Sequence, residues 1–555
     1  MDPHKTWMDV LSRIGLVVLA TLVVVVGYLM YNAGRFKALT AMEAMDCGQL
    51  AWNLAQGEGY TTNVIRPLSL ASHPQLYRHP ELRQAPLHPY IASLLMRVIP
   101  EKPRALALSC GVGFLLTAPI IFLLGWHLFD LRTGIIATAL YVTNLAYLQY
   151  AISGLPVTWV MFFVSLLFLT CYHLPRKQRL RLHLAAAAGA LVGLIYLTAY
   201  LWLAVLPVIG LYVFFASDKR DRWVTLLAFA VAFIIIVAPW CVRNANLTGN
   251  PFFTYRWAED VMGTRSNPGN TLHRQFTPSY PSLLLYAIDR PMEMVEKARS
   301  GLIRVYPILS RLAGTYLTPF FLAAMLVTMG PRAFERLRWL WYGVFAALVL
   351  MLMVVAPMEN TLVPMAPLAV VIATGFFLRL VDARLDDLAP SRYKRLMGFF
   401  VAGLLVLHCI PLATDLFRFG EPEAASDAAR QSADAAREVV GVTTGSIVTD
   451  VPWLIAWYTD TPAIWLPKTR VDLRNLQDKM GKITWLLMTP QVASPEYDRF
   501  ERMLREWGMA WNRALRADID FEGYSVQKRL ADGRWILLRA DARAKRDLQP
   551  PETDE

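Results

Sequence analysis

The sequence predicts a polytopic α-helical membrane protein with about eleven spanning helices and a water-soluble C-terminal α/β domain. Of the 555 residues, 55% are hydrophobic and only 18% are charged, and the mean hydropathy is +0.36. Several apolar runs reach the roughly 20 residues that are needed to cross a bilayer. After residue 415 the composition changes, and short apolar segments alternate with polar helical ones. These observations together predict the membrane part and the separate C-terminal domain.

The first apolar run, Ile14–Tyr31, contains no charged residue. It is longer than the apolar core of a signal peptide, and no small-residue cleavage site follows it, so we expect a retained anchor. The spanning helices are predicted near residues 14–31, 105–125, 133–150, 155–174, 184–199, 201–216, 222–240, 313–330, 339–357, 361–380 and 397–415.

Basic residues are concentrated in short loops that follow the fourth, sixth, eighth and tenth predicted helices. They are Arg176, Lys177, Arg179 and Arg181, then Lys219, Arg220 and Arg222, then Arg332, Arg336 and Arg338, then Arg384, Arg392, Lys394 and Arg395. Such loops remain in the cytoplasm, so the N-terminus is predicted to be cytoplasmic. The long segments 32–104, 241–312 and 416–555 then lie outside a bacterial inner (plasma) membrane, and we expect the function there.

The net charge of +12 is explained by these loops, so we expect no nucleic-acid partner. We divide the chain into a membrane module, residues 1–415, and an extracytoplasmic (periplasmic) domain, residues 416–555. In that domain, predicted helices at 424–440, 453–458 and 497–507 alternate with predicted strands at 446–449, 463–466 and 484–488. Asp532 and Gly533 separate strand-like segments at 524–528 and 535–539, which indicates a hairpin.

The first outer loop carries an amphipathic pattern. The apolar residues Leu87, Tyr90, Ile91, Leu94, Leu95 and Val98 recur at helical spacing, with Pro89 in the first turn. We expect this helix to lie flat on the membrane surface.

Asp46 is the candidate general base. It lies on a predicted helix, Glu43–Gln56, that Gly57 and Gly59 close, and Gln49 and Asn53 share its face. A carboxylate at the membrane surface is suited to taking a proton from an acceptor. The alternative is a solvated loop acid.

Arg243 is the candidate phosphate ligand, because it follows the seventh predicted helix directly. A guanidinium donates pairs of hydrogen bonds that match phosphate oxygens. The alternative is an arginine that reaches lipid headgroups. Arg66 in the first outer loop and Arg256 in the second are further candidates, with His273 and Arg274 beside the latter.

Metal binding is less well supported. The spacing of His73, His79 and His88, with Glu81 nearby, matches no compact ligand motif. We assign no metal site, although a divalent metal remains an open alternative, and His88 is expected to orient the surface helix. A disulfide between Cys47 and Cys241 is a second open alternative to two small apolar residues.

Four stretches, in order along the chain, resemble the GT-C superfamily of integral-membrane glycosyltransferases. They resemble most the branch of protein O-mannosyltransferases and lipid A aminoarabinose transferases. The stretches are Asp46–Tyr60 with its acid, helix and Gly-x-Gly-aromatic ending, Ala85–Tyr90, Ala238–Asn244 with its Pro-Trp-x-x-Arg-Asn turn, and Asp450–Tyr458.

The resemblance implies an enzyme that takes a sugar from a polyprenyl-phosphate carrier and transfers it to a lipid, glycan or protein acceptor. By this likeness Asp46 activates the acceptor and Arg243 holds the leaving phosphate. We therefore expect the two residues to meet in one cavity with room for a prenyl tail. Side chains expected to contact the acceptor or sugar are Gln49, Asn53, Tyr60 and His88.

The sequence departs from the family in two places. Cys47 stands where relatives often have a second acid, and Gly154–Thr158 contains no acid near the fourth helix. A second carboxylate is therefore unassigned. The candidates are Glu58, Glu81, Glu259 and Asp260.

Two other classes of function remain as alternatives. A lipid or glycan flippase or transporter would place polar residues inside several spanning helices, and these helices have few. A noncatalytic scaffold of envelope assembly would tolerate loss of Asp46. The C-terminal aromatic residues are candidates for stacking on a sugar, but at their spacing a core role is favoured; they are Trp453, Trp457, Tyr458 and Trp465.

Overall fold

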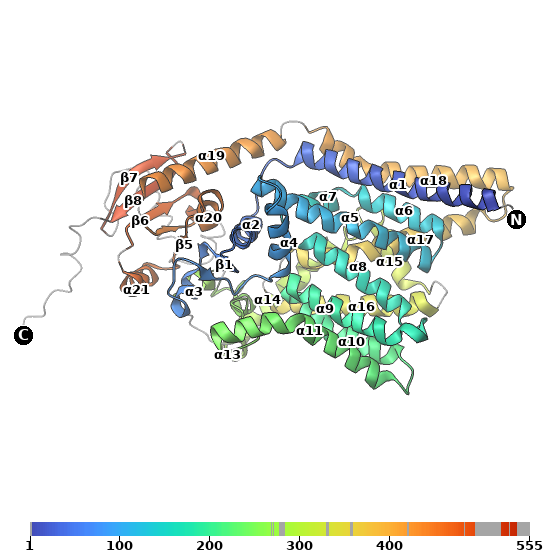
Figure 1. The fold of residues 1–555 in the computed structure, drawn as a ribbon, viewed down its shortest axis with the longest axis horizontal. Coiled ribbons are helices and arrows are strands. Elements are labelled where there is room, and N and C mark those ends of the chain that lie inside the picture. Colours follow the sequence, from blue (N-terminus) through green and yellow to red (C-terminus); the bar gives the residue numbers. More distant parts are fainter. Residues whose placement is uncertain are drawn as a thin grey trace, which may run out of the picture.

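The computed structural model describes residues 3–267, 269, 271–276, 283–328, 332–355, 359–418, 421–443, 445–481, 483–493, 523–531 and 533–540. A bundle of long helices forms one end of the molecule and a β-sheet forms the other (Figure 1). The N-terminus and the turn between α17 (Ala366–Leu385) and α18 (Pro390–Leu416) lie at the bundle end, far from the sheet. The predicted helix at 497–507 lies outside the described residues.

Each predicted span overlaps at least one helix of the bundle. These helices are α1 (Pro3–Arg35), α5 (Lys102–Leu128), α6 (Leu131–Val142), α7 (Leu145–Ala151), α8 (Val157–His173), α9 (Arg181–Thr198), α10 (Val205–Ala216), α11 (Arg222–Thr248), α15 (Thr318–Leu326), α16 (Arg332–Val354), α17 and α18. Within the described residues, seven helices are long and apolar enough to cross a membrane. The protein is therefore a polytopic membrane protein, and its other predicted spans contain shorter helices.

Two of these shorter spans differ from the prediction. The predicted helix at 133–150 breaks after Val142, because the Asn144 side chain accepts a hydrogen bond from the Ala146 amide at 3.0 Å and starts α7. The predicted start at residue 313 is wrong, since α15 begins only at Thr318. Gly314, with φ +92°, ends the preceding turn in a left-handed conformation.

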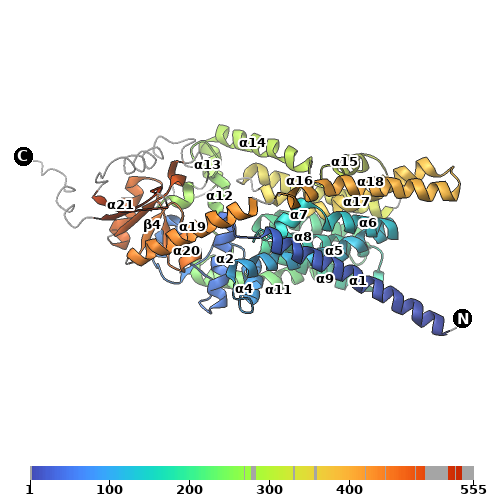
Figure 2. The same ribbon diagram turned by 90° about the horizontal axis from the view of Figure 1, so that it is seen from above.

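Helices α1 and α18 meet only at the end nearest the sheet. There the Arg35 Nε donates to Asp415 Oδ2 at 2.8 Å. Toward the N-terminus the two helices diverge (Figure 2). Residues Val17–Arg35 of α1 and the whole of α18 expose most of their apolar side chains, as expected for surfaces that face lipid.

The first outer loop is structured throughout. It forms α2 (Met42–Ala55), α3 (Pro67–Ser72), α4 (Leu87–Met96), and the two-residue strands β1 (Thr61–Thr62), β2 (Val64–Ile65) and β3 (His79–Pro80). The predicted amphipathic helix is confirmed as α4, and its position on the membrane surface stays a prediction. Its Tyr90 and Leu94 are exposed, whereas His88 and Ala92 are buried, so the apolar face points outward and remains available to lipid.

The second outer loop forms α12 (Trp257–Val261), the 3-10 turn η3 (Thr271–Arg274), α13 (Leu283–Asp289) and α14 (Pro291–Leu309). Arg274 links this loop to the C-terminal domain, because its Nε donates to the Leu466 carbonyl at 2.7 Å. The loop therefore lies between the membrane module and the sheet.

The C-terminal domain has the predicted α/β architecture. Its elements are α19 (Glu421–Val442), β4 (Ile447–Thr449), α20 (Pro452–Thr459), β5 (Ala463–Trp465), α21 (Arg470–Met480), β6 (Trp485–Met488), β7 (Tyr524–Leu530) and β8 (Trp535–Ala540). The strand order is β2-β5-β4-β6-β8-β7. Strands β2, β5, β4 and β6 run parallel, and the predicted hairpin β7–β8 completes the sheet in the antiparallel direction.

The edge strand β2 comes from the first outer loop, which the sequence did not predict. Val64 pairs with Ala463 and Ile65 with Ile464. One hydrophobic cluster continues across this junction and joins α2 to α20. The C-terminal domain and the first outer loop thus share a core.

Gly48 allows the close approach of α20 to α2. A Cβ atom at this position would lie 2.8 Å from the Trp457 ring and 2.9 Å from Leu106. We expect Gly48→Ala to destabilise the protein by about 1–3 kcal/mol, because overpacking forces buried side chains to move. Thermal unfolding in detergent measures this effect. Gly441→Ala on α19, where a Cβ meets nothing within 4 Å, is the control, and equal melting temperatures for both variants would contradict the prediction.

Candidate active site

Asp46 is buried at the centre of a charged cluster between the outer loops. Its side chain is 4% exposed, and Oδ2 forms a close ion pair with the Arg66 guanidinium. Arg83 Nη1 lies 3.9 Å from the same oxygen. The other carboxylate oxygen, Oδ1, has no hydrogen-bond partner among the described residues. This oxygen is therefore the part of Asp46 that is available to a substrate hydroxyl.

Helix α2 holds Asp46 in place because its end is fixed. Gly57 and Gly59 adopt φ values of +82° and +81°, which terminates the helix as the sequence predicted. The chain then turns back through β1 and β2, and this return brings Arg66 against Asp46. The helix end and the ion pair thus have the same local origin.

Glu81 shares Arg66 with Asp46. Its Oε2 accepts from Arg66 Nη1 at 3.2 Å, and its Oε1 accepts from the backbone amides of Arg83 and Gln84. Burial alone would raise the pKa of Glu81, but Arg66 and these amide donors hold it below its usual value. Glu81 is therefore an anion, and Arg66 bridges two carboxylates.

A third carboxylate, Glu259, lies on α12 and faces the same cluster. Arg83 Nη2 lies 2.9 Å from Oε1, and Arg256 Nε lies 3.0 Å from Oε2. Burial opposes the charge, yet these two arginines hold the pKa of Glu259 well below its usual range. His273 lies 3.8 Å away, and burial lowers its pKa to about 4, so it is neutral at pH 7.

Replacement of Glu259 by glutamine is expected to cost about 3–5 kcal/mol of stability, because Arg83 and Arg256 lose the carboxylate that they share. The melting temperature in detergent measures this loss. Glu296→Gln changes an exposed acid on α14 and is the matched control. A Glu259→Gln protein that melts with the control would contradict a structural role for this pair.

Gln49 and Asn53 are buried on the face of α2 that also carries Asp46. Gln49 Oε1 accepts from the Asn63 amide at 2.9 Å, and its Nε2 donates to Asn53 Oδ1 at 2.8 Å. Asn53 Nδ2 donates to the Thr61 carbonyl at 3.0 Å. These bonds hold β1 and β2 on α2, so contact with a sugar stays a prediction for both residues.

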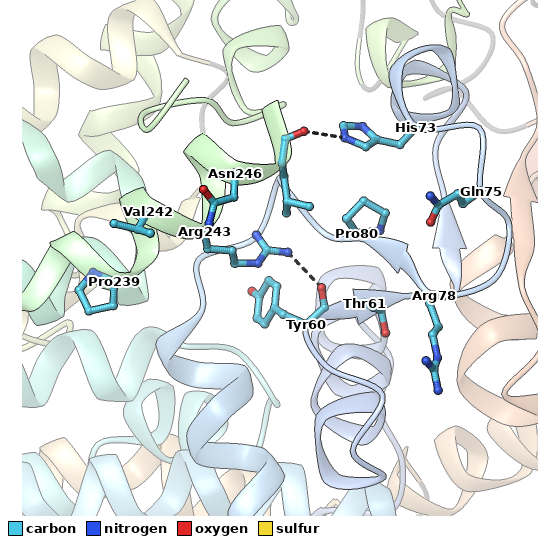
Figure 3. A pocket seen from close by; sticks show the side chains of 11 residues that line it. Tyr60, Thr61, His73, Gln75, Arg78, Pro80, Pro239, Val242, Arg243 and Asn246 are labelled. Carbon is cyan, nitrogen blue, oxygen red and sulfur yellow. Dashed lines mark hydrogen bonds between the residues drawn. The ribbon is translucent and has the colours of Figure 1, made fainter. Parts of the chain in front are cut away.

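Arg243 lines an open groove of about 610 Å³ (Figure 3). The groove is lined by Tyr60, Thr61, His73, Gln75, Arg78, Pro80, Pro239, Val242, Arg243, Asn246 and Leu247. The Arg243 guanidinium donates to the backbone carbonyls of Tyr60 at 3.2 Å and Glu81 at 3.0 Å. It also lies over the rings of Trp240, at 4.5 Å, and Tyr60, at 5.0 Å.

Arg243 differs from the other predicted phosphate ligands in its ion pairs. Among the described residues no carboxylate forms an ion pair with it. Arg66 and Arg256 are each paired with buried carboxylates. An incoming phosphate would therefore find a guanidinium with which no described carboxylate forms an ion pair, next to the apolar side chains of Val242 and Leu247.

Asp46 and Arg243 line two separate cavities, so the prediction that they meet in one cavity is wrong. Asp46 lines a separate cavity of about 10 Å³ with Met42, Val64, Arg66, Arg83, Trp453 and Trp465. This space holds about one water molecule. The segment 60–66 contributes to both cavities and lies between them, because it is packed on α2 by the hydrogen bonds of Gln49 and Asn53.

His88 is buried and contacts sulfur on two helices. Its Nδ1 lies 3.3 Å from Cys47 Sγ, and its Nε2 lies 3.6 Å from Cys110 Sγ. Burial lowers the pKa of His88 to about 4, so the neutral ring joins α2, α4 and α5. The predicted contact of His88 with a sugar remains untested.

No group of three potential metal ligands occurs in the part of the chain that the structure describes. Cys47 and Cys241 are both free thiols, so the alternative of a disulfide is not realised.

Two other candidates for the second carboxylate were Glu58 and Asp260. Glu58 is exposed. The pKa of Asp260 is raised to about 6 by burial, and Lys297 Nζ binds its backbone carbonyl at 2.6 Å.

The C-terminal tryptophans are buried, as their spacing predicted. Trp453, Trp457 and Trp465 are 6%, 3% and 5% exposed. Trp453 and Trp465 contact edge to face, with ring centroids 5.7 Å apart, and both line the cavity of Asp46. The C-terminal domain therefore forms part of the wall around the candidate base.

The roles of two residues in the site were not predicted from the sequence. Arg83 was not assigned a role, although it joins Asp46 to Glu259, and Glu81 was one of four unassigned acids. The signal was present in the composition of the loop, because Glu81 stands between Arg78 and Arg83. Charged loop residues are usually solvated, and only the folded loop shows that these are buried.

No protein-family model matches the sequence, and no curated protein matches it. Solved structures do match. The structure of ArnT from Cupriavidus metallidurans in the apo state matches with a TM-score of 0.57 and 12% identity, covering 96% of this chain and 99% of that chain. The same protein bound to undecaprenyl phosphate matches with a TM-score of 0.56 at 12% identity, over the same shares of the two chains.

The archaeal oligosaccharyltransferase AglB from Archaeoglobus fulgidus, in complex with an inhibitory peptide and a dolichol-phosphate, is a further match. Its TM-score is 0.50 at 14% identity, covering 86% of this chain and 70% of that chain. At such identities the likeness establishes the fold. The chain has the fold of GT-C integral-membrane glycosyltransferases, which confirms the fold that its four motifs predicted.

Proposed function

We propose that the protein is a glycosyltransferase that moves a sugar from a polyprenyl-phosphate carrier to a lipid, glycan or protein acceptor. The reaction takes place on the outer face of the bacterial inner membrane, with the N-terminus in the cytoplasm and the sheet outside. The positions of the basic loops support this orientation. The N-terminus and the sheet lie at opposite ends of the helix bundle (Figure 1).

One observation carries the proposal. Asp46 is a buried carboxylate whose Oδ1 has no hydrogen-bond partner among the described residues. A chain of contacts joins it to Arg243, with which no described carboxylate forms an ion pair. The contacts run through Arg66 and Glu81. ArnT and AglB, which have the same fold, have been captured with undecaprenyl phosphate and dolichol-phosphate respectively, which supports a prenyl phosphate as the ligand of the Arg243 groove.

The proposed transfer balances as a displacement at the anomeric carbon. The acceptor hydroxyl gives its proton to Asp46 Oδ1, and its oxygen forms a new bond to the sugar. The bond between the sugar and the phosphate oxygen breaks, and the phosphate leaves with one more negative charge. Arg243 stabilises this charge through paired hydrogen bonds.

The reaction requires that the two cavities join when the donor binds. A phosphate that takes the two N–H donors of Arg243 Nη2 displaces the carbonyls of Tyr60 and Glu81. Release of those carbonyls removes one set of contacts that holds segment 60–66; the others are its bonds to Gln49 and Asn53 and the pairing of β2 with β5. We therefore place the first step of catalysis in a movement of this segment.

A transporter is less well supported. In the bundle, the buried His408 Nε2 lies 2.8 Å from the carbonyl of Leu140, and Asn144 caps α7. Both polar groups satisfy backbone atoms where helices break, which is a structural use. A scaffold differs from the enzyme in one measurable respect, because it does not need the charge of Asp46.

The test is a comparison of lipid extracts from a deletion strain and its parent by mass spectrometry. We expect the deletion strain to accumulate one polyprenyl-phosphate-linked sugar and its envelope glycans to lack the same sugar. Purified protein added to membranes of that strain should consume the accumulated lipid. Extracts and glycans that are identical in the two strains would rule the proposal out.

A further inference from the structure

Glu81 touches both halves of the candidate site with different atoms. Its carboxylate binds Arg66 at 3.2 Å, and Arg66 binds Asp46. Its backbone carbonyl accepts from Arg243 at 3.0 Å, and its backbone amide donates to the Tyr60 carbonyl at 3.3 Å. One residue therefore connects the arginine of the groove to the carboxylate of the small cavity.

The main chain around Glu81 is well suited to transmit a displacement. The pairs Thr61–Pro80 and Thr62–His79 join β1 to β3, directly before Glu81. The carboxylate is fixed at its other side by the amides of Arg83 and Gln84. A shift of the Glu81 backbone therefore moves its carboxylate relative to Arg66.

Asp46 and Glu81 compete for a single guanidinium. Arg66 directs Nη2 to Asp46 and Nη1 to Glu81. If the Glu81 carboxylate withdraws, the charge of Arg66 acts more strongly on Asp46, and if it approaches, Asp46 is released. The strength of the Asp46–Arg66 pair thus depends on where Glu81 stands.

We infer that Glu81 is a positioning residue that couples donor phosphate at Arg243 to the state of Asp46. A phosphate that takes the N–H donors of Arg243 Nη2 competes with the carbonyls of Tyr60 and Glu81. Release of the Glu81 carbonyl shifts its carboxylate on Arg66 and frees Asp46 for the acceptor. This inference rests on the proposed function, and it assigns a role to the carboxylate that the sequence left open.

The coupling is measured with undecaprenyl phosphate as the probe. Affinities for purified protein in detergent are determined for the parent, Asp46→Asn, Glu81→Gln and the double variant. If the two residues acted independently, the fold-change in affinity of the double variant would equal the product of the two single fold-changes. We expect it to differ from that product by at least about threefold, because coupled sites share free energy. Asp450→Asn, which changes a buried carboxylate bound to Thr489 in the C-terminal domain, is the matched control and should combine multiplicatively with Asp46→Asn.

A second measurement separates positioning from folding. Glutamine keeps the shape of Glu81 and its backbone carbonyl, so Glu81→Gln should bind undecaprenyl phosphate within about twofold of the parent. Its rate of consuming the polyprenyl-phosphate sugar in deletion-strain membranes should fall at least about tenfold. The Asp450→Asn control should retain the parent rate.

The outcomes distinguish the coupling through Glu81 from the proposed glycosyltransferase function. Multiplicative affinities, or a Glu81→Gln protein that turns over like the Asp450→Asn control, would overturn the coupling. A parent protein that consumes no polyprenyl-phosphate sugar would overturn the proposed function, while the affinity cycle would still report whether Glu81 couples the two residues.

Discussion

Replacement of Asp46 by asparagine is expected to lower sugar transfer at least about a hundredfold, because a general base contributes roughly 10²–10⁴ to the rate. The amide has nearly the shape of the carboxylate but cannot take the acceptor proton. The measurement is the rate at which purified protein consumes the polyprenyl-phosphate sugar in deletion-strain membranes.

The fold of the Asp46→Asn protein has to survive for this result to count. Arg66 keeps Glu81 as a partner, and Arg83 keeps Glu259, so neither arginine is left without a carboxylate. Retained binding of undecaprenyl phosphate is the check. Glu58→Gln, an exposed acid just beyond the same helix, should transfer at the parent rate. An active Asp46→Asn protein would remove the proposed base.

Replacement of Arg243 by alanine is expected to weaken binding of undecaprenyl phosphate about 10- to 100-fold. A hydrogen bond to a charged group contributes about 1.5–3 kcal/mol, and a guanidinium offers two parallel bonds to phosphate. Arg243→Lys keeps the charge but loses this geometry, so its affinity should lie between alanine and the parent.

The control for Arg243 is Arg104→Ala. Arg104 is about half exposed at the start of α5 and pairs with Glu101, so its loss should leave the affinity unchanged. Equal affinities for Arg243→Ala and the parent would show that the phosphate binds elsewhere. Arg78, which lines the same groove, would then be the next residue to test.

The helices and the C-terminal strands followed from local patterns. Apolar runs of sufficient length predicted the bundle, and the alternation of short strands with helices predicted β4, α20, β5 and β6. The strand β2 could not be predicted this way, because two residues, Val64 and Ile65, have no period. Its pairing with β5 depends on a contact about 400 residues away along the chain.

Local patterns also predicted part of the site. Asp46 lies near the start of α2, and motif and spacing identify both it and Arg243. The predicted helix end before Arg243 is wrong, because α11 continues to Thr248. The burial of Arg66, Arg83 and Glu259 depends on two outer loops that fold against each other, and a single loop sequence carries no sign of it. The separate cavities are likewise a product of packing, since Gln49 holds the intervening segment on α2.

The central claim is that one polyprenyl phosphate brings the Arg243 groove and the Asp46 cavity together. The most direct test is an experimental structure of the protein with undecaprenyl phosphate bound. We expect phosphate oxygens at about 3 Å from the Arg243 guanidinium, the Tyr60 and Glu81 carbonyls released from it, and a continuous cavity that reaches Asp46 Oδ1. A phosphate bound away from Arg243, or a bound structure in which segment 60–66 still separates the two cavities, would contradict it.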